Sequence, residues 1–372
     1  MERTAIHVGK GTVPLVLGKP TNTAATVSHM RRPHRRVGLP SLVVLLLVGT
    51  LAACGGDGSS SSGGKVTIYS GRTQNLVEPI LEKFAEETGI DVDVRYGLSS
   101  DLALLIEEEG DKSPADLFLS QTPGAVGYLD KKGLLGTLPR AVLDLVQADL
   151  HAHDGSWVGF SGRKRVLAYD PDRLTGPELP KSVLDLVNPE WKGRLGVAPS
   201  NASFQDFVTA MRLKLGDDRT VAWLRGVAAN DAFTFVNNNA IVAAIDRGEI
   251  ELGLVNHYYV FQAIAENPAF RTRNHDFPKD DLGSLLIVTG AAVTKSSRNQ
   301  EQAVALVRYL LQKHAQEYFS EQTFEYPLAA GVEPAKVLPP VNFGAVEGID
   351  YDQLGGDLDS TRKMIRDAGL EG

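Results

Sequence analysis

Short apolar runs and amphipathic segments alternate along the chain from residue 65 onward. The run at 65–71, KVTIYSG, predicts a buried strand, and residues 73–89 carry the apolar spacing of a helix. A second strand is predicted at 90–97, a second helix at 99–110 and a third strand at 115–120. This strand–helix order predicts a doubly wound α/β unit with a parallel sheet.

A second series of the same kind follows later in the chain. Strands are predicted at 193–199 and 250–256, and helices at 202–216, 240–249 and 257–268. The fold class expected from the two series is therefore α/β, with two doubly wound lobes.

Two longer apolar segments, 161–171 and 283–295, are expected to cross from one lobe to the other. Two lobes joined by two crossing strands make a hinge, with a ligand held in the cleft between them. The expected division of the chain places residues 65–164 and 289–339 in the first lobe, and residues 165–288 with 340–372 in the second.

The N-terminal region has the pattern of a secretion signal. Met30 opens a stretch with four arginines, followed by an apolar run and small residues before Cys54. The apolar run is too short for a permanent membrane span. Residues 1–53 are expected to comprise an over-extended start before Met30 and then the signal peptide, and residues 54–64 to be a flexible tether.

The tetrapeptide Leu51-Ala52-Ala53-Cys54 resembles the lipobox of bacterial lipoproteins, in which the cysteine carries the lipid. The alternative is a plain secretory signal with a chance cysteine. Cys54 is the single cysteine of the chain and a Gly/Ser tether follows it, which favours lipidation and an outward-facing, membrane-anchored protein.

Charge narrows the choice of partners. The chain has 38 Lys and Arg against 46 Asp and Glu, a net charge of −8. Residues 1–53 contain seven of the basic residues and one of the acidic residues, so the remainder carries about −14. This balance argues against nucleic acid or an anionic membrane surface as the partner. Without a further cysteine, disulfides and thiolate metal sites are excluded.

Polar residues follow the predicted strands, where open α/β sheets collect their ligands. The loops concerned are 70–73, 120–123, 199–203, 236–240 and 256–259. None of them contains a recognisable catalytic triad.

Tyr258 and Tyr259 stand side by side where a predicted strand gives way to a helix. In the first turn of a helix adjacent side chains diverge by about 100° and can both reach an ion beyond the N-terminus. Fe³⁺ lowers the pKa of a bound phenol and stabilises the phenolate. The alternative, favoured by the dipeptide alone, is ordinary helix packing. His257 points elsewhere and is expected at the surface or behind the tyrosines.

Several segments together resemble a known family. They are YSGRTQNLVEPILEKFAEETGIDVDVRYG, SPADLFLSQTPGAVGYL, WVGFSGRKRVLAYDPD, LPKSVLDLVNPEWKGRLGVAPSNASFQDFVTAMR, VNNNAIVAAI, GLVNHYYV and EQTFEYPLAAGVEP. In this order they are similar to the ferric-iron-binding proteins of bacterial ABC importers, which are transferrin-like class II periplasmic binding proteins. The resemblance implies that Tyr258 and Tyr259 supply two phenolate ligands to iron.

The chain departs from the family at three further ligand positions. Where several members have a histidine and a glutamate, this chain has Arg72 and Gln121, and where some have a third tyrosine it has Asn201. The resemblance then implies a synergistic carbonate or phosphate that completes the coordination of Fe³⁺. An arginine fork suits such an anion, which assigns Arg72 to it.

The same resemblance assigns the anion four weaker contacts, Ser200, Ser203, Asn238 and Asn256. For Arg72 the alternative is a salt bridge at the cleft rim, and for the serines and asparagines it is turn capping. Arg163 is expected to be a hinge or surface charge.

The function implied is that of a binding protein, not an enzyme: a monomeric, lipid-anchored receptor that delivers ferric iron to an ABC permease and its ATPase. Two alternatives keep the fold and change the cargo, to a ferric chelate or to a small organic solute such as a phosphonate or polyamine. A secreted hydrolase is disfavoured because the post-strand loops contain neither paired carboxylates nor a His/Asp/Glu cluster.

Overall fold

The computed structural model describes residues 63–341, 349–355 and 357–371. The predicted signal peptide and the lipidation site Cys54 lie outside the described residues. Within those ranges, no helix combines the length and the apolar character needed to span a bilayer.

The first α/β series forms as its apolar spacing predicts. Strands β1 (Lys65–Ser70), β2 (Asp91–Tyr96) and β3 (Leu117–Ser120) alternate with helices α1 (Gln74–Thr88) and α2 (Ser99–Glu109). β1 lies between β2 and β3 and runs parallel to both. α1 ends at Gly89, whose φ of 69° is in the left-handed region that favours glycine.

The second series also forms where it was predicted, with one further helix (Asp217–Ala229) and one short strand (Phe233–Thr234) that were not predicted. It comprises β5 (Leu195–Val197), α5 (Ala202–Leu215), α6 (Asp217–Ala229), β6 (Phe233–Thr234), α7 (Asn238–Asp246), β7 (Leu252–Asn256) and α8 (Tyr258–Glu266). β5 runs parallel to both β6 and β7.

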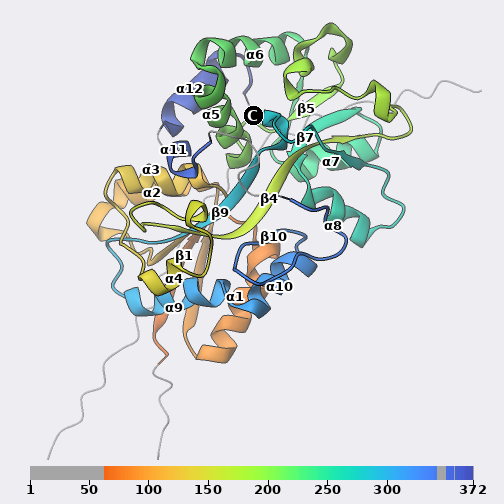
Figure 1. The fold of residues 1–372 in the computed structure, drawn as a ribbon. Helices are drawn as coiled ribbons and strands as arrows, with labels where there is room; N and C mark the ends of the chain where they lie inside the picture. Colours follow the sequence, from red (N-terminus) through yellow and green to blue (C-terminus); the bar gives the residue numbers. More distant parts are fainter. Residues whose placement is uncertain (1–62, 342–348, 356, 372) are drawn as a thin grey trace, which may run out of the picture. The chain divides into compact units, whose positions relative to one another are not determined.

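Two strands connect the two series, as predicted. β4 (Val158–Tyr169) pairs antiparallel with β9 (Leu286–Val293) along its first part and with β7 along its second. β9 in turn pairs with β3. The resulting strand order is β2-β1-β3-β9-β4-β7-β5-β6, with β8 (Arg273–His275) and β10 (Tyr326–Pro327) also on β4. Figure 1 shows β4 and β9 running through the middle of the sheet.

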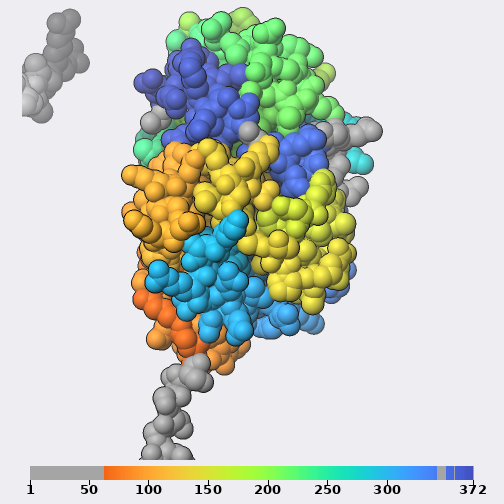
Figure 2. Space-filling model, turned by 90° about the vertical axis from the view of Figure 1, so that its left-hand side faces the viewer, coloured from red at the N-terminus to blue at the C-terminus, as the bar shows by residue number. Residues whose placement is uncertain are grey.

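The remaining helices cover these strands. They are α3 (Pro123–Lys131), α4 (Arg140–Leu143), α9 (Gln300–Leu310), α10 (Lys313–Glu321), α11 (Tyr351–Leu354) and α12 (Leu358–Asp367). The C-terminal helices contact both series: α11 packs on α3, and α12 packs on α5 and α6. In Figure 2 the dark blue C-terminal residues lie between the green residues above and the orange and yellow residues below.

Candidate functional site

Tyr258 and Tyr259 are the first two residues of α8, directly after β7 and His257. Both side chains are buried, with 0% and 5% exposure, and their ring centroids lie 4.1 Å apart. Burial raises the pKa of Tyr258 well above its usual value of 10. The Tyr258 hydroxyl makes no hydrogen bond of normal geometry within the described part of the chain. A buried tyrosine usually finds a partner for its hydroxyl, so the unpartnered hydroxyl of Tyr258 is unusual for a residue of the core.

Arg72 lies in the loop after β1 and is 2% exposed. Its NH2 group donates to Glu325 Oε2 at 2.5 Å, while Nε and NH1 have no partner among the described residues. Arg72 therefore forms a salt bridge, but the pair is buried and not at the cleft rim that the alternative placed it at. Burial by itself lowers the pKa of Arg72, but its charge interactions with Glu325 and then with Tyr258 and Tyr259 outweigh that effect, so the pKa is raised.

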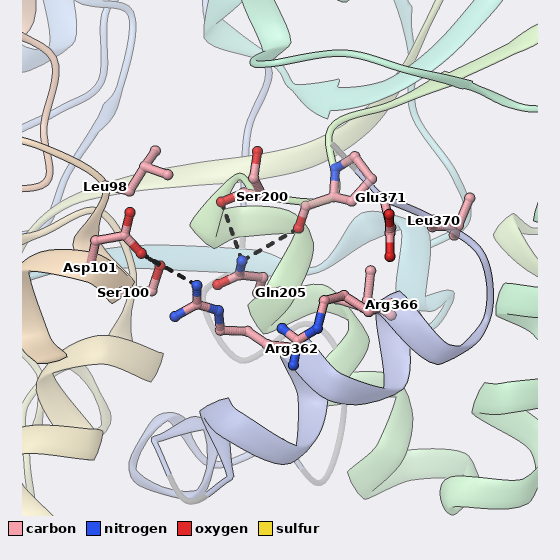
Figure 3. A pocket seen from close by; sticks show the side chains of 11 residues that line it. Leu98, Ser100, Asp101, Ser200, Gln205, Arg362, Arg366, Leu370 and Glu371 are labelled. Carbon is pink, nitrogen blue, oxygen red and sulfur yellow. Dashed lines mark hydrogen bonds and ion pairs between the residues drawn. The ribbon is translucent and has the colours of Figure 1, made fainter.

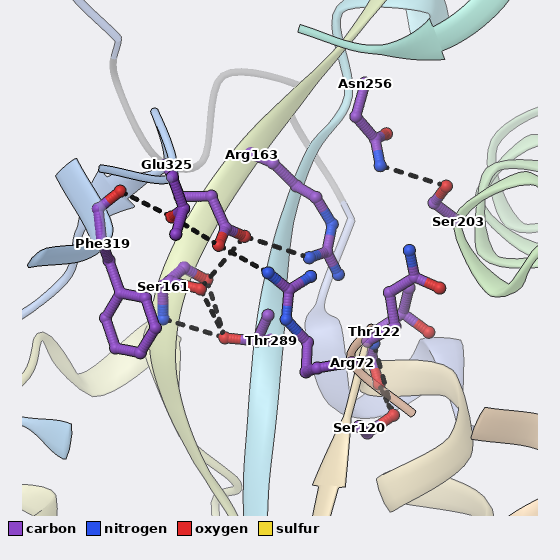
Figure 4. A network of polar contacts seen from close by, with 12 residues as sticks. Arg72, Ser120, Thr122, Ser161, Arg163, Ser203, Asn256, Thr289, Phe319 and Glu325 are labelled. Carbon is purple, nitrogen blue, oxygen red and sulfur yellow. Dashed lines mark hydrogen bonds and ion pairs between the residues drawn. The ribbon is translucent and has the colours of Figure 1, made fainter. Parts of the chain in front are cut away.

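Glu325 connects the site to the crossing strands, a role that the sequence did not suggest. Its carboxylate accepts hydrogen bonds from Arg72, from Arg163 NH1 at 3.3 Å and from the Ser161 hydroxyl at 3.2 Å. Ser161 of β4 is also hydrogen-bonded to Thr289 of β9. Figure 4 shows Arg72 and Arg163 converging on Glu325 between these two strands.

Arg163 and Arg165 lie two residues apart on β4 and therefore point to the same face of the sheet. Of the two expectations for Arg163, a hinge or a surface charge, the surface charge is wrong, because β4 is a central strand and Arg163 is 0% exposed. Arg165 is 1% exposed and donates to Ser203 Oγ and Asn256 Oδ1, both at 3.3 Å. Burial lowers the pKa of Arg165 to about 9, which leaves it charged at neutral pH.

The structure brings two of the four predicted weaker anion contacts to this place. Ser203 and Asn256 are hydrogen-bonded to each other at 3.2 Å and both contact Arg165. Asn201 instead caps α5, with Oδ1 accepting from the Ser203 amide at 3.0 Å and from the Ser203 hydroxyl at 2.6 Å.

The other two predicted contacts, Ser200 and Asn238, are not hydrogen-bonded to the arginines or tyrosines of this site within the described residues. Ser200 lines a separate pocket of about 460 Å³ together with Gln205 and Arg362 (Figure 3). Asn238, the first residue of α7, is 1% exposed, and its Nδ2 has no partner within the described ranges.

His257 is not at the surface, contrary to one of the two expectations for it. It is 2% exposed, stacks on Tyr326 with ring centroids 4.9 Å apart, and accepts a hydrogen bond from the Lys164 amide at Nδ1. Burial lowers the pKa of His257 to about 3, so the ring is neutral. It therefore supports the start of α8 from behind.

Another set of potential metal ligands lies at the surface. His153, Asp350 and Asp352 have ligand atoms within 4.8 Å of one another, but His153 is exposed and none of the three belongs to the tyrosine site.

Sequence and structure comparisons agree on the relatives of this chain. The pattern of the bacterial extracellular solute-binding protein family matches residues 112–352. An Fe(3+)-binding periplasmic protein from Serratia marcescens is 32% identical over 88% of this chain and 97% of its own length. The major ferric iron-binding protein of Neisseria meningitidis is 33% identical over 74% of this chain and 84% of its own length.

Among solved structures, iron-bound HitA from Pseudomonas aeruginosa is similar with a TM-score of 0.79 and 33% identity, covering 82% of this chain and 99% of that one. A Trichodesmium protein solved with iron and citrate ligands has a TM-score of 0.69 and 27% identity, covering 83% and 100%. The fold is that of the class II periplasmic binding proteins. The chain thus belongs to the bacterial extracellular solute-binding protein family.

Proposed function

We propose that this protein is an extracytoplasmic receptor that captures ferric iron together with an oxyanion and delivers it to an ABC permease. The observation that carries the proposal is the buried pair Tyr258 and Tyr259, in which the Tyr258 hydroxyl has no hydrogen-bond partner among the described residues and both phenols interact electrostatically with the buried Arg72. The names of the iron-binding relatives from Serratia and Neisseria support the choice of cargo.

The buried tyrosines suit the binding of a trivalent cation, because such a cation can stabilise a phenolate that burial alone disfavours. The Tyr258 phenol does not ionise by itself at neutral pH, because desolvation disfavours the phenolate and raises the pKa of Tyr258. Fe³⁺ replaces the phenolic proton and compensates the charge of the phenolate. The two oxygens then hold the ion, and the remaining coordination positions go to an exogenous anion such as carbonate or phosphate.

In this proposal Arg72 is the residue that would hold the anion. Its Nε and NH1 groups have no partner among the described residues and form the fork that matches a planar oxyanion. Ser203 and Asn256 are the uncharged residues that we propose as further contacts of the anion, because both are hydrogen-bonded to Arg165. Ser200 and Asn238 have a weaker claim to such a role.

Binding couples to closure of two lobes about β4 and β9. In this proposal residues 65–164 with 289–339 form the lobe that carries Arg72, and residues 165–288 with 340–372 form the lobe that carries the tyrosines. A ligand that contacts both lobes favours the closed arrangement, since it binds that state more tightly. A permease and its ATPase then recognise the closed monomer, which is held at the membrane by a lipid on Cys54.

The test is a ferric titration of the apo-protein, followed by the charge-transfer absorbance of iron-bound phenolate. We expect colour in the native protein and its loss in Tyr258→Phe and Tyr259→Phe. Each substitution is expected to lower iron affinity by more than about 100-fold, since even residues behind metal ligands contribute 10- to 100-fold. Tyr96→Phe, on the half-buried strand β2, is the control and keeps the colour. A native protein that stays colourless and metal-free with every oxyanion tried overturns the proposal.

A further inference from the structure

A cavity of about 460 Å³ is enclosed by the first turn of α2, the start of α5 and one face of α12 (Figure 3). Its size is within the range of about 300–1,000 Å³ that is typical of sites for small organic molecules. None of the residues that line it is a tyrosine or arginine of the site described above. The cavity is therefore a place where a different ligand could bind.

Gln205 presents a buried hydrogen-bond acceptor to this cavity. Its side chain is 3% exposed, and its Nε2 donates to the carbonyl oxygens of Pro199 at 3.4 Å and Ser200 at 3.2 Å. These two bonds fix the orientation of the amide, and Figure 3 shows Oε1 directed away from both carbonyls. Oε1 has no hydrogen-bond partner among the described residues. A buried acceptor without a donor is costly, so this atom indicates a ligand that donates a hydrogen bond.

Two arginines of α12 form a basic wall of the cavity. Arg362 and Arg366 are four residues apart, so they lie on the same face of the helix, and both line the cavity. Arg362 forms one ion pair, with Asp101 at 3.4 Å, whereas Arg366 forms none among the described residues. Like charges at this spacing repel each other, and a carboxylate bound to both guanidinium groups would relieve that repulsion.

Two acidic residues line the same cavity and balance these arginines. Asp101 lies in the first turn of α2, and Glu371 follows α12. Two guanidinium groups and two carboxylates have no net charge. A ligand that is itself neutral overall, with one group of each sign, therefore suits the cavity better than a multiply charged anion.

Apolar side chains complete the lining. Ile365 and Leu370 are 2% exposed, and Leu98, which precedes α2, is 41% exposed. An apolar group in the cavity would remove part of the exposed Leu98 side chain from water, which stabilises the bound state.

We propose that this cavity is a second ligand site, which binds a small zwitterion with an apolar side chain. Arg362 and Arg366 hold its carboxylate, and Gln205 Oε1 accepts a hydrogen bond from its ammonium group. The apolar group lies against Leu98 and Ile365. This chemistry is shared by a free aliphatic amino acid and a short apolar peptide. Binding needs neither iron nor the tyrosines, so the site does not depend on the function proposed above.

Calorimetric titration of the full mature chain, free of iron, tests the site with leucine and with leucyl-leucine. We expect at least one of them to bind, and the tighter of the two identifies the source. Acetylating its amino group or amidating its carboxylate is expected to weaken binding at least about tenfold, because a hydrogen bond to a charged group is worth that factor or more. Absence of binding by both probes at millimolar concentration overturns the proposal, and so does equal binding of the blocked derivatives.

Two variants assign the contacts. In Arg366→Met the carboxylate loses a partner, so amidation of the ligand is expected to weaken binding less than it does in the native protein. In Gln205→Met the ammonium group loses its acceptor, so acetylation is expected to weaken binding less. Arg225→Met removes an exposed arginine of α6 that does not line the cavity, and both losses are expected to stay as in the native protein. Undiminished losses in Arg366→Met and Gln205→Met refute the assigned contacts.

The thermal unfolding of each variant shows whether it folds. Arg366→Met breaks no ion pair among the described residues, whereas Gln205→Met removes two buried hydrogen bonds. If a variant does not fold, the comparison of free and blocked ligands on the native protein still decides the matter. Phenolate colour with iron in a protein that binds neither leucine nor leucyl-leucine keeps the iron receptor and removes only the second site.

Discussion

Glu325→Gln is the most informative single change, because it removes one charge while keeping the size of the side chain. Glu325 is 0% exposed and accepts hydrogen bonds from Arg72 at 2.5 Å, Arg163 at 3.3 Å, Ser161 at 3.2 Å and Thr323 at 3.1 Å. The glutamine creates no cavity but leaves two buried guanidinium groups without a counter-charge. Its amide nitrogen is a hydrogen-bond donor and would face the donors that now bind the carboxylate.

Removing one member of a buried ion pair costs about 3–5 kcal/mol, since the remaining charge stays desolvated. We therefore expect Glu325→Gln to lower the free energy of unfolding of the apo-protein by about that amount in a urea titration. The control is Glu107→Gln, which breaks the partly exposed ion pair with Lys132 and is expected to cost less than about 1 kcal/mol. A loss in Glu325→Gln no larger than in the control would refute the reasoning.

The same variant has a second consequence for the apo-protein. With Glu325 neutral, the site carries one more positive charge, and we expect added citrate without iron to raise the unfolding midpoint of Glu325→Gln more than that of the native protein. Equal shifts in the two proteins would mean that the arginines do not bind the anion.

Two further substitutions probe groups beside the site. Burial raises the pKa of Asp206 from 3.8 to about 7, so between these pH values the folded protein holds a proton that the unfolded chain has released. The free energy of unfolding is therefore expected to fall by a few kcal/mol as the pH rises from about 4 to about 7. Asp206→Asn should remove that fall in urea titrations across this range. A pH profile unchanged by the substitution contradicts this. In β7, a Cβ added at Gly253 would lie 2.2 Å from Cγ2 of the buried Ile241, so Gly253→Ala is expected to cost about 1–3 kcal/mol by overpacking, whereas Gly176→Ala, with no atom within 4 Å, should be neutral.

Much of the architecture is predictable from local patterns. Most strands and helices of the two α/β series, and the two crossing segments, follow from apolar spacing, because period 2 and period 3.6 are properties of neighbouring residues; α6 and β6 were not predicted. The placement of Tyr258 and Tyr259 at the start of α8 is also local, since a strand, a polar turn and an apolar helix follow one another within a few residues.

The electrostatic design of the site was not predictable in the same way. The spacing of Arg163 and Arg165 within an apolar strand is a signal that they share a buried face, but it says nothing of their partners. Whether a strand is central depends on which strands pair with it, and β4 is covered because β9 lies against its first part and β7 against its second.

The sequence alone determined the fold class, the order of the elements and the tyrosine pair, because these depend on residues close together in the chain. Only the tertiary structure decided that Glu325, 253 residues from Arg72, is its counter-charge. It also decided that Arg72, Arg163 and Arg165 are all buried away from solvent. Charge balance is a property of the groups that share one volume, and chain distance does not encode which groups those are.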